Sequence, residues 1–175
     1  MRVLGIDPGT QNMGYGLLEG DFKMVECGVL TAGRRQDLPV RLANLYQQLL
    51  NLIDHFQPDE IAVEEPFVPR IDRDVRTAII VGQAQAVVLM ASALKELPVY
   101  RYLPAQIRSV VVGYGAGTKS QVQEMLKLQL GLEQAPTSQD ASDALAVAVF
   151  HLSQQRLLKI TEHQKSAQKS RLKTS

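Results

Sequence analysis

The sequence predicts a single α/β domain, with a five-stranded mixed sheet and helices on both of its faces. Two observations lead to this prediction. Three short strand-like segments follow one another within the first thirty residues, and strands then alternate with helices along the rest of the chain. A meander followed by alternation is typical of a sheet that contains both antiparallel and parallel strands.

Five segments have the length and the apolar pattern of β-strands. They are residues 3–6, 13–18, 22–30, 60–64 and 99–102. Asp7-Pro8-Gly9-Thr10 is a strong turn signal after the first strand, and Glu19-Gly20-Asp21 makes a tight turn between the second and third. The first three strands are therefore expected to form the meander.

Helices are expected over 38–56, 72–96, 104–111, 119–130 and 138–155. The first has leucines and a phenylalanine at helical spacing and ends before Pro58, and Pro98 ends the second. Thr137 or Ser138 can cap the last helix after Pro136. Small residues recur along this last helix, so it can lie close to the sheet.

Composition bounds the class of protein. A chain of 175 residues with 45% apolar and 21% charged residues is typical of one soluble globular domain. The apolar runs are too short to span a membrane, and the start of the chain reads as a strand rather than a signal peptide. The single Cys27 excludes an intramolecular disulfide framework and a cysteine-based metal site. We expect a cytoplasmic protein without a membrane partner.

Charge divides the chain at about residue 155. Residues 156–175 hold six Lys or Arg and one Glu, whereas residues 1–155 hold 13 Lys or Arg and 17 Asp or Glu. The sequence thus predicts a folded domain over 1–155 and a basic tail over 156–175 that is disordered beyond about residue 158. A basic tail is compatible with phosphate contacts and equally with a solubilising role.

Four acidic residues stand where an α/β fold places function. Asp7 ends the first strand and Glu64 ends the fourth, while Asp140 and Asp143 share one face of the last helix. Two unit charges about 4 Å apart repel by roughly 4 kcal/mol at an effective dielectric constant of 20, so such a cluster needs a cation. Carboxylates without His or Cys suit hard divalent ions, magnesium or manganese.

Taken singly, these acids have ordinary explanations. Asp7 precedes Pro-Gly, where Asp is a common turn residue, and Asp140 gains from the dipole of a first helical turn. Glu64 is harder to explain away, because a Glu at the end of an apolar strand is seldom buried alone. The next residue, Glu65, is also acidic, so the sequence leaves open which of the two points toward the other acids. Side chains alternate along a strand, so Glu64 lies on the same side as Ile61 and Val63 only if the alternation changes at the strand end.

Several motifs together resemble the RuvC family of Holliday junction resolvases. They are Leu4-Gly5-Ile6-Asp7-Pro8-Gly9, Gly14-Tyr15-Gly16, Ala62-Val63-Glu64, Val111-Val112-Gly113-Tyr114-Gly115, Lys119-Ser120-Gln121-Val122 and Asp140-Ala141-Ser142-Asp143-Ala144-Leu145-Ala146. Their order and spacing run through residues 1 to about 152. The stretch over 81–86 departs from the family pattern on a helix that the resemblance expects at a dimer interface.

The resemblance implies a ribonuclease H-like fold, a homodimer, and two Mg2+ ions per active site with Mn2+ as a substitute. It also implies paired symmetric nicks in four-way DNA junctions, leaving 5′-phosphate and 3′-hydroxyl ends, in recombination and repair alongside the RuvA–RuvB branch-migration complex. Asp7, Glu64, Asp140 and Asp143 correspond to the catalytic metal ligands. Lys119 corresponds to a basic residue near the scissile phosphate.

Further residues are candidates for contacts with DNA. Phe67 resembles the family's aromatic that stacks on an unpaired base, and stacking suits a Phe in a loop after Pro66. The candidates for phosphate contacts are Arg70, Arg73, Arg76, Arg108 and Lys119. For the arginines, ordinary solvated charge is an equally good interpretation.

Two other functions compete with that of a nuclease. The segment 5–10 also resembles the first phosphate loop of the actin, Hsp70 and sugar-kinase superfamily, but those proteins need a second such domain, for which 175 residues leave no room. A junction-binding protein without catalysis would have no need to gather four acids where phosphates bind. The sequence therefore favours a metal-dependent endonuclease.

Overall fold

The computed structural model describes residues 1–33, 35–65, 75–111 and 118–171. The strands are β1 (Arg2–Asp7), β2 (Asn12–Glu19), β3 (Lys23–Thr31), β4 (Glu60–Glu64) and β5 (Val99–Tyr102). The helices are α1 (Leu38–Phe56), α2 (Val75–Leu94), α3 (Pro104–Val111), α4 (Lys119–Gln129) and α5 (Gln139–Arg171). This is the predicted order of elements, although residues 72–74 of the expected second helix lie outside the described ranges.

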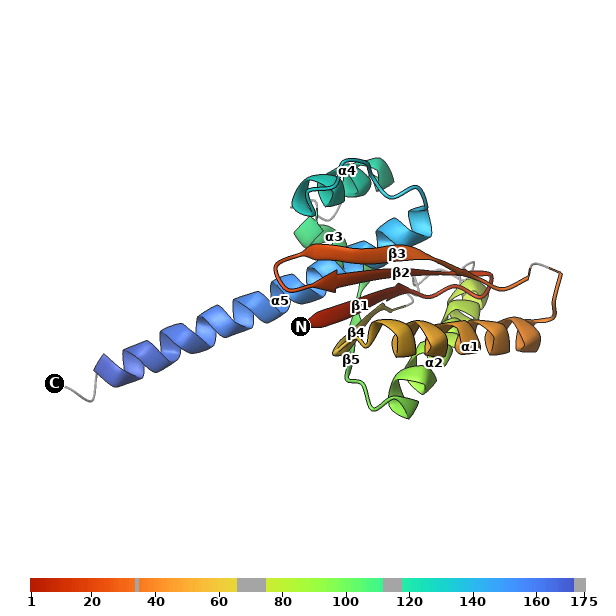
Figure 1. Ribbon diagram of the computed structural model, residues 1–175, viewed down its shortest axis with the longest axis horizontal. Helices are drawn as coiled ribbons and strands as arrows, with labels where there is room; N and C mark the ends of the chain where they lie inside the picture. The colour runs from red at the N-terminus through yellow and green to blue at the C-terminus, as the bar shows by residue number, and fades with distance from the viewer. Residues whose placement is uncertain (34, 66–74, 112–117, 172–175) are drawn as a thin grey trace.

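The five strands form one mixed sheet in the order β3-β2-β1-β4-β5 (Figure 1). β1, β2 and β3 pair antiparallel as the predicted meander, whereas β1 pairs parallel with β4 and β4 parallel with β5. Because β1 and β4 are parallel neighbours, their carboxyl ends lie at the same edge of the sheet. The mixed sheet predicted from the sequence is confirmed.

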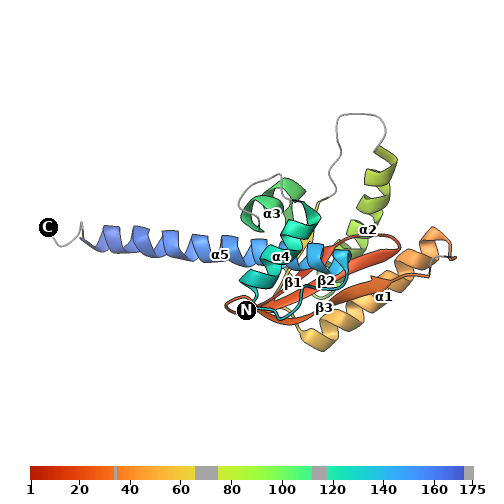
Figure 2. The same ribbon diagram turned by 90° about the horizontal axis from the view of Figure 1, so that it is seen from above.

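Helices cover both faces of the sheet, and each face has its own apolar core. On one face, α1 and α2 pack on Leu4, Ile6, Ile61 and Val63. On the other face, α5 lies across β1, β2, β3 and β4, with α3 and α4 packed against it. Figures 1 and 2 show these two helical layers on opposite sides of the strands. A strand between two such layers turns alternate side chains into different cores.

Helix α5 is much longer than the sequence predicted. It was expected to end near residue 155, with disorder beyond about residue 158, but it continues to Arg171 and projects away from the sheet (Figures 1 and 2). The segment 156–171 contains neither Gly nor Pro and is rich in residues of high helix propensity. Extending an existing helix needs no new nucleus, so a polar segment can continue it without a core to pack on.

None of the helices within the described ranges is both long enough and apolar enough to cross a membrane.

Candidate active site

Asp7 and Glu64 end neighbouring parallel strands. Ile6 pairs in register with Val63, so the next residue on each strand is the acid that closes it. Ile6 and Val63 point into the core beneath α1 and α2. Side chains alternate along a strand, so Asp7 and Glu64 point to the opposite face, the one covered by α5. Both carboxylates are partly buried.

The structure separates Glu64 from Glu65. Alternation from Ile61 and Val63 had seemed to require a change of face at the strand end, and that reasoning was wrong because both faces of the sheet are covered. Ala62 belongs to the core under α5, and Glu64, two residues later on the strand, points to the same face. Glu65 instead forms an ion pair with Arg101 of β5, with 3.3 Å between Glu65 Oε1 and Arg101 Nε.

Glycines in the sheet let α5 approach it closely. Gly14 of β2 pairs in register with Asp7, and a Cβ atom built on Gly14 would lie 2.0 Å from the backbone oxygen of Asp140. A Cβ atom on Gly5 of β1 would lie 2.2 Å from the backbone oxygen of Ala144. The backbone of α5 thus rests directly on the strands, and its first turn lies over the residue beside Asp7.

Asp140 and Asp143 lie in the first turns of α5. Ser138 begins the helix, since its Oγ accepts a long hydrogen bond from the Ala141 backbone N–H at 3.4 Å, which selects Ser138 from the two predicted caps. The Gln139 side chain donates to Asp143 Oδ1 at 2.8 Å. An acid so near the start of a helix is stabilised by the helix dipole. Both aspartates are partly buried.

Three elements therefore bring the four acids to one edge of the sheet: the ends of β1 and β4 and the start of α5. Within the four described ranges, no three His, Cys, Asp or Glu residues stand grouped as they would around a metal ion. The donor set nonetheless fits a hard divalent cation, because it consists of carboxylates alone. The close approach that Gly14 leaves open fits such a site as well. Asp7, Glu64, Asp140 and Asp143 are the residues that could hold it.

The predicted basic residues lie on several helices. Lys119 is the first residue of α4, which a capping box between Thr118 and Gln121 begins. Arg108 is exposed on α3 and Arg76 is exposed on α2. These two helices cover opposite faces of the sheet, so the structure does not bring these arginines together. Phe67, Arg70 and Arg73 lie outside the described residues.

A buried polar network was missed by sequence reasoning. Its centre is His151, which lies within α5 and is fully buried. Its Nδ1 is 2.7 Å from the hydroxyl of Tyr102, and its Nε2 is 2.6 Å from Oε2 of Glu60. The signal in the sequence was a lone His inside the apolar run 144–152 of a helix that packs on a sheet.

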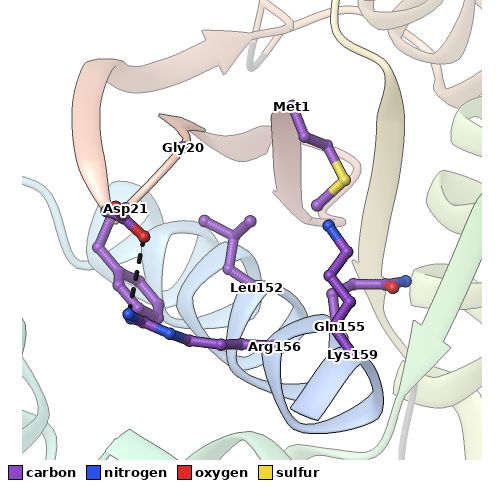
Figure 3. A pocket seen from close by; sticks show the side chains of 8 residues that line it. Met1, Gly20, Asp21, Leu152, Gln155, Arg156 and Lys159 are labelled. Atoms are coloured by element: carbon purple, nitrogen blue, oxygen red, sulfur yellow. Dashed lines mark ion pairs between the residues drawn. The ribbon is translucent and has the colours of Figure 1, made fainter. Parts of the chain in front are cut away.

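A pocket of about 250 Å3 lies at the other end of the sheet (Figure 3). Its lining comes from the start of the chain, the β2–β3 turn and the middle of α5: Met1, Gly20, Asp21, Phe22, Leu152, Gln155, Arg156 and Lys159. Arg156 and Asp21 face each other across it, with 3.8 Å between Nη2 and Oδ1. The carboxylates do not line this pocket, so it is separate from the candidate active site.

Comparison with known proteins identifies relatives across almost the whole chain. A family model described as crossover junction endodeoxyribonuclease RuvC matches residues 3–151. The RuvC protein of Dehalococcoides mccartyi is 45% identical over 163 residues, which cover 91% of this chain and 96% of the relative. That of Chloroflexus aggregans is 46% identical over 154 residues, which cover 86% of this chain and 92% of the relative.

Solved structures agree with these matches. Thermus thermophilus RuvC in complex with a Holliday junction substrate superposes with a TM-score of 0.80 at 32% identity, covering 90% of this chain and 96% of that one. A yeast mitochondrial Holliday junction resolvase has a TM-score of 0.60 at 18% identity over 85% of this chain and 76% of its own, a likeness in fold alone. The predicted ribonuclease H-like fold is confirmed, and the chain belongs to the RuvC family of crossover junction endodeoxyribonucleases.

Proposed function

We propose that this chain resolves four-way DNA junctions by hydrolysing phosphodiester bonds at the carboxylate edge of its sheet. One observation carries the proposal. Asp7 and Glu64 end adjacent parallel strands on the face covered by α5, and Gly14 lets the first turn of α5, which carries Asp140, rest on β2 beside Asp7. A relative that is 32% identical was solved with a Holliday junction substrate, which supports the choice of DNA.

Asp7, Glu64, Asp140 and Asp143 would hold Mg2+, with Mn2+ as a substitute and two ions in each site. When bound, such ions activate a water molecule on one side of the phosphodiester and stabilise the leaving 3′ oxygen on the other. The chain's own contribution is positional: the strands fix two of the acids and the helix fixes the other two. The carboxylates would turn toward a common point, which rotation about their side-chain bonds allows.

Basic and aromatic residues would position the DNA. At the start of α4, Lys119 would stabilise negative charge on the phosphoryl oxygens. Phe67 would stack on an unpaired base, and Arg70, Arg73, Arg76 and Arg108 would contact the phosphate backbone. Contacts of this kind hold a branched substrate without reading its sequence.

Paired nicks require two active sites, and we propose that a homodimer provides them. Helix α2 exposes large apolar side chains that a monomer would leave in water, with Ile79, Met90 and Leu94 between 58% and 63% exposed. Met90 also lines an apolar groove of about 330 Å3 between α1 and α2. Two copies of this surface would bury each other and set the two sites for symmetric cuts.

The same proposal covers the products and the setting of the reaction. Each cut would leave a 5′-phosphate and a 3′-hydroxyl, ends that a ligase can rejoin. The enzyme would act in the cytoplasm, in recombination and repair, beside the RuvA–RuvB complex that moves the junction. A pull-down of purified RuvA–RuvB on junction DNA, with and without this protein, tests that partnership.

Cleavage of synthetic DNA tests the central claim. The protein is mixed with four-way, Y-shaped and linear duplexes, with and without Mg2+. We expect Mg2+-dependent paired cuts in the four-way junction, and Asp7→Asn should abolish cutting while leaving junction binding intact. Asp21→Asn is the matched control, because its exposed carboxylate lies at the far end of the sheet. Equal cutting of linear duplex would refute junction selectivity, and cutting by Asp7→Asn would refute the assignment of the site.

A further inference from the structure

His151 links α5 to two strands through short hydrogen bonds. One ring nitrogen contacts Tyr102 of β5 at 2.7 Å and the other contacts Glu60 of β4 at 2.6 Å. The imidazole has no exposed surface, and the ring centroid of Tyr100 lies 4.6 Å away. Glu60 keeps only 18% of its side chain exposed. A fully buried imidazole thus stands between two partly buried polar side chains at the edge of an apolar core.

Each contact of the network can be satisfied when the imidazole is neutral. The carboxylate of Glu60 can only accept, so Nε2–H of His151 donates to it, and Nδ1 is left to accept from the hydroxyl of Tyr102. A charged imidazole would instead donate from both nitrogens, so burial decides between the two forms. Burial lowers the pKa of His151 against the opposing effect of Glu60, and burial, with smaller contributions from Tyr100 and Glu60, raises the pKa of Tyr102 to about 12. Both directions agree with the neutral forms.

The network and the candidate active site lie on the same faces of the same two elements. Asp140 and His151 are eleven residues apart, about three helical turns, so they share one face of α5 roughly 16 Å apart. Glu60 and Glu64 share one face of β4 about 13 Å apart. Helix α5 runs antiparallel to β1 and to its parallel neighbour β4. Ala144 and Ala148 lie over Gly5 of β1, whereas Asp140, earlier in the helix, lies over Gly14, the partner of Asp7 at the end of β1. The hydrogen bond between Glu60 and His151 therefore joins β4 and α5 at one end of their contact, and Glu64 and Asp140 lie toward the other end.

We propose that Glu60, His151 and Tyr102 are positioning residues, which fix the axial position and rotation of α5 on β4 and β5 so that Asp140 and Asp143 stay opposite Asp7 and Glu64. Packing between glycines and alanines tolerates a small slide along the helix axis, whereas hydrogen bonds of 2.6 and 2.7 Å do not. Buried polar groups add little stability over an apolar core, so their use here points to a gain in position. This inference rests on the proposed function of the four acids.

The first test removes one oxygen atom from the network. Tyr102→Phe keeps the ring that packs on Phe150 and loses the hydroxyl that His151 accepts from. Tyr100→Phe is the matched control, because it removes a hydroxyl from the same strand and keeps the ring beside His151. We expect Tyr102→Phe to weaken Mn2+ binding, measured by calorimetry, and to slow single-turnover junction cleavage, each by about 10-fold, with junction binding unchanged. Tyr100→Phe should match the wild type.

A second pair of variants separates hydrogen bonding from charge. Glu60→Gln keeps an oxygen that accepts from His151 and should retain Mn2+ affinity, whereas Glu60→Leu removes the acceptor and should lose it. Circular dichroism and melting temperature establish that each variant is folded. Equal Mn2+ affinity in Tyr102→Phe and Tyr100→Phe would overturn the proposal, and so would equal losses in Glu60→Gln and Glu60→Leu.

Amide hydrogen exchange makes the test independent of the metal. Residues 139–145, at the start of α5, should exchange faster in metal-free Tyr102→Phe than in metal-free Tyr100→Phe. If the wild type neither bound Mn2+ nor cut junctions, the proposed function would fail while this comparison still decided the role of the network. Identical exchange in the two variants would refute the positioning role whatever the wild type does with metal.

Discussion

Gly14 lies directly beneath Asp140: a Cβ atom at Gly14 would come within 2.0 Å of the Asp140 backbone oxygen. The nearest obstacle is helix backbone, which cannot move aside as a flexible side chain can. Gly14 is also the register partner of Asp7. The missing side chain therefore lets the helical turn that carries Asp140 rest beside the strand end that carries Asp7.

Gly14→Ala should separate the two acids. The methyl group would push the first turn of α5 off β2, and overpacking of this kind costs roughly 1–3 kcal/mol of folding free energy. We expect junction cleavage to fall by about 10-fold or more in protein that remains folded, with a lower urea midpoint. Gly33→Ala serves as the control, since its Cβ would meet only the exposed side chain of Gln36, at 3.2 Å. Full activity in Gly14→Ala would show that cleavage does not depend on the close contact between β2 and α5.

Glu64 and Glu65 should differ sharply in their importance. Glu64→Gln removes a proposed metal ligand. Residues that only support metal ligands contribute about 10–100-fold to activity, so we expect the cleavage rate of Glu64→Gln to fall by more than about 100-fold. Glu65→Gln breaks an ion pair with Arg101 whose side chains are 30% and 55% exposed, and pairs of this kind contribute at most about 1 kcal/mol. Cleavage by Glu65→Gln should stay within about twofold of the wild type. Junction-cleavage rates in saturating Mg2+ measure both, and the reverse order would identify Glu65 as the ligand.

Local signals were enough to place most elements of the fold. Pro58 and Pro98 marked the ends of α1 and α2 within a few residues, and the leucine spacing of α1 predicted its bounds. The prediction failed for the C-terminal segment, where polar and charged composition did not mean disorder. Polarity suggested a disordered tail, yet a segment without Gly or Pro continues α5 to Arg171.

The edge of the sheet that the four acids share could not be derived from local patterns. Spacing paired Asp140 with Asp143, but the order of the strands and the direction of α5 decide which acids lie at the same edge. Alternation was misread at Glu64 because one strand faces two cores, a property of the whole sheet. The partners of His151 give no local signal either, since Glu60 and Tyr102 lie 91 and 49 residues away in the chain.

The exposed apolar face of α2 should be the contact of the proposed dimer. Met90→Glu would place a charge in that contact, at a cost of roughly 3 kcal/mol, so the dimer should dissociate about 100-fold more readily. Leu128→Glu is the control, since Leu128 of α4 is 66% exposed and Met90 is 61% exposed. Analytical ultracentrifugation measures the dissociation constants. A Met90→Glu variant that dimerises like the wild type would place the contact elsewhere.

The stability of the fold should fall in mild acid because of His151. Burial holds its pKa below the ordinary value of 6.5, although Glu60 of β4 raises it somewhat, and Tyr100 and Tyr102 of β5 complete its surroundings. At pH values between the pKa of His151 in the folded protein and its pKa in the unfolded chain, the unfolded chain binds more protons. The contribution of the neutral ring to the free energy of unfolding is therefore present above pH 6.5 and declines below it.

His151→Gln removes the titrating group and isolates this effect. Urea unfolding of wild type and variant at pH 7.5, 6.5 and 5.5 gives the free energy of unfolding of each protein. The advantage of the wild type over the variant should shrink as the pH falls below 6.5, by at most about 1.4 kcal/mol per pH unit. An advantage that stayed constant from pH 7.5 to 5.5 would mean that the folded protein binds the proton as readily as the unfolded chain does, contrary to the burial of this ring between α5 and the sheet.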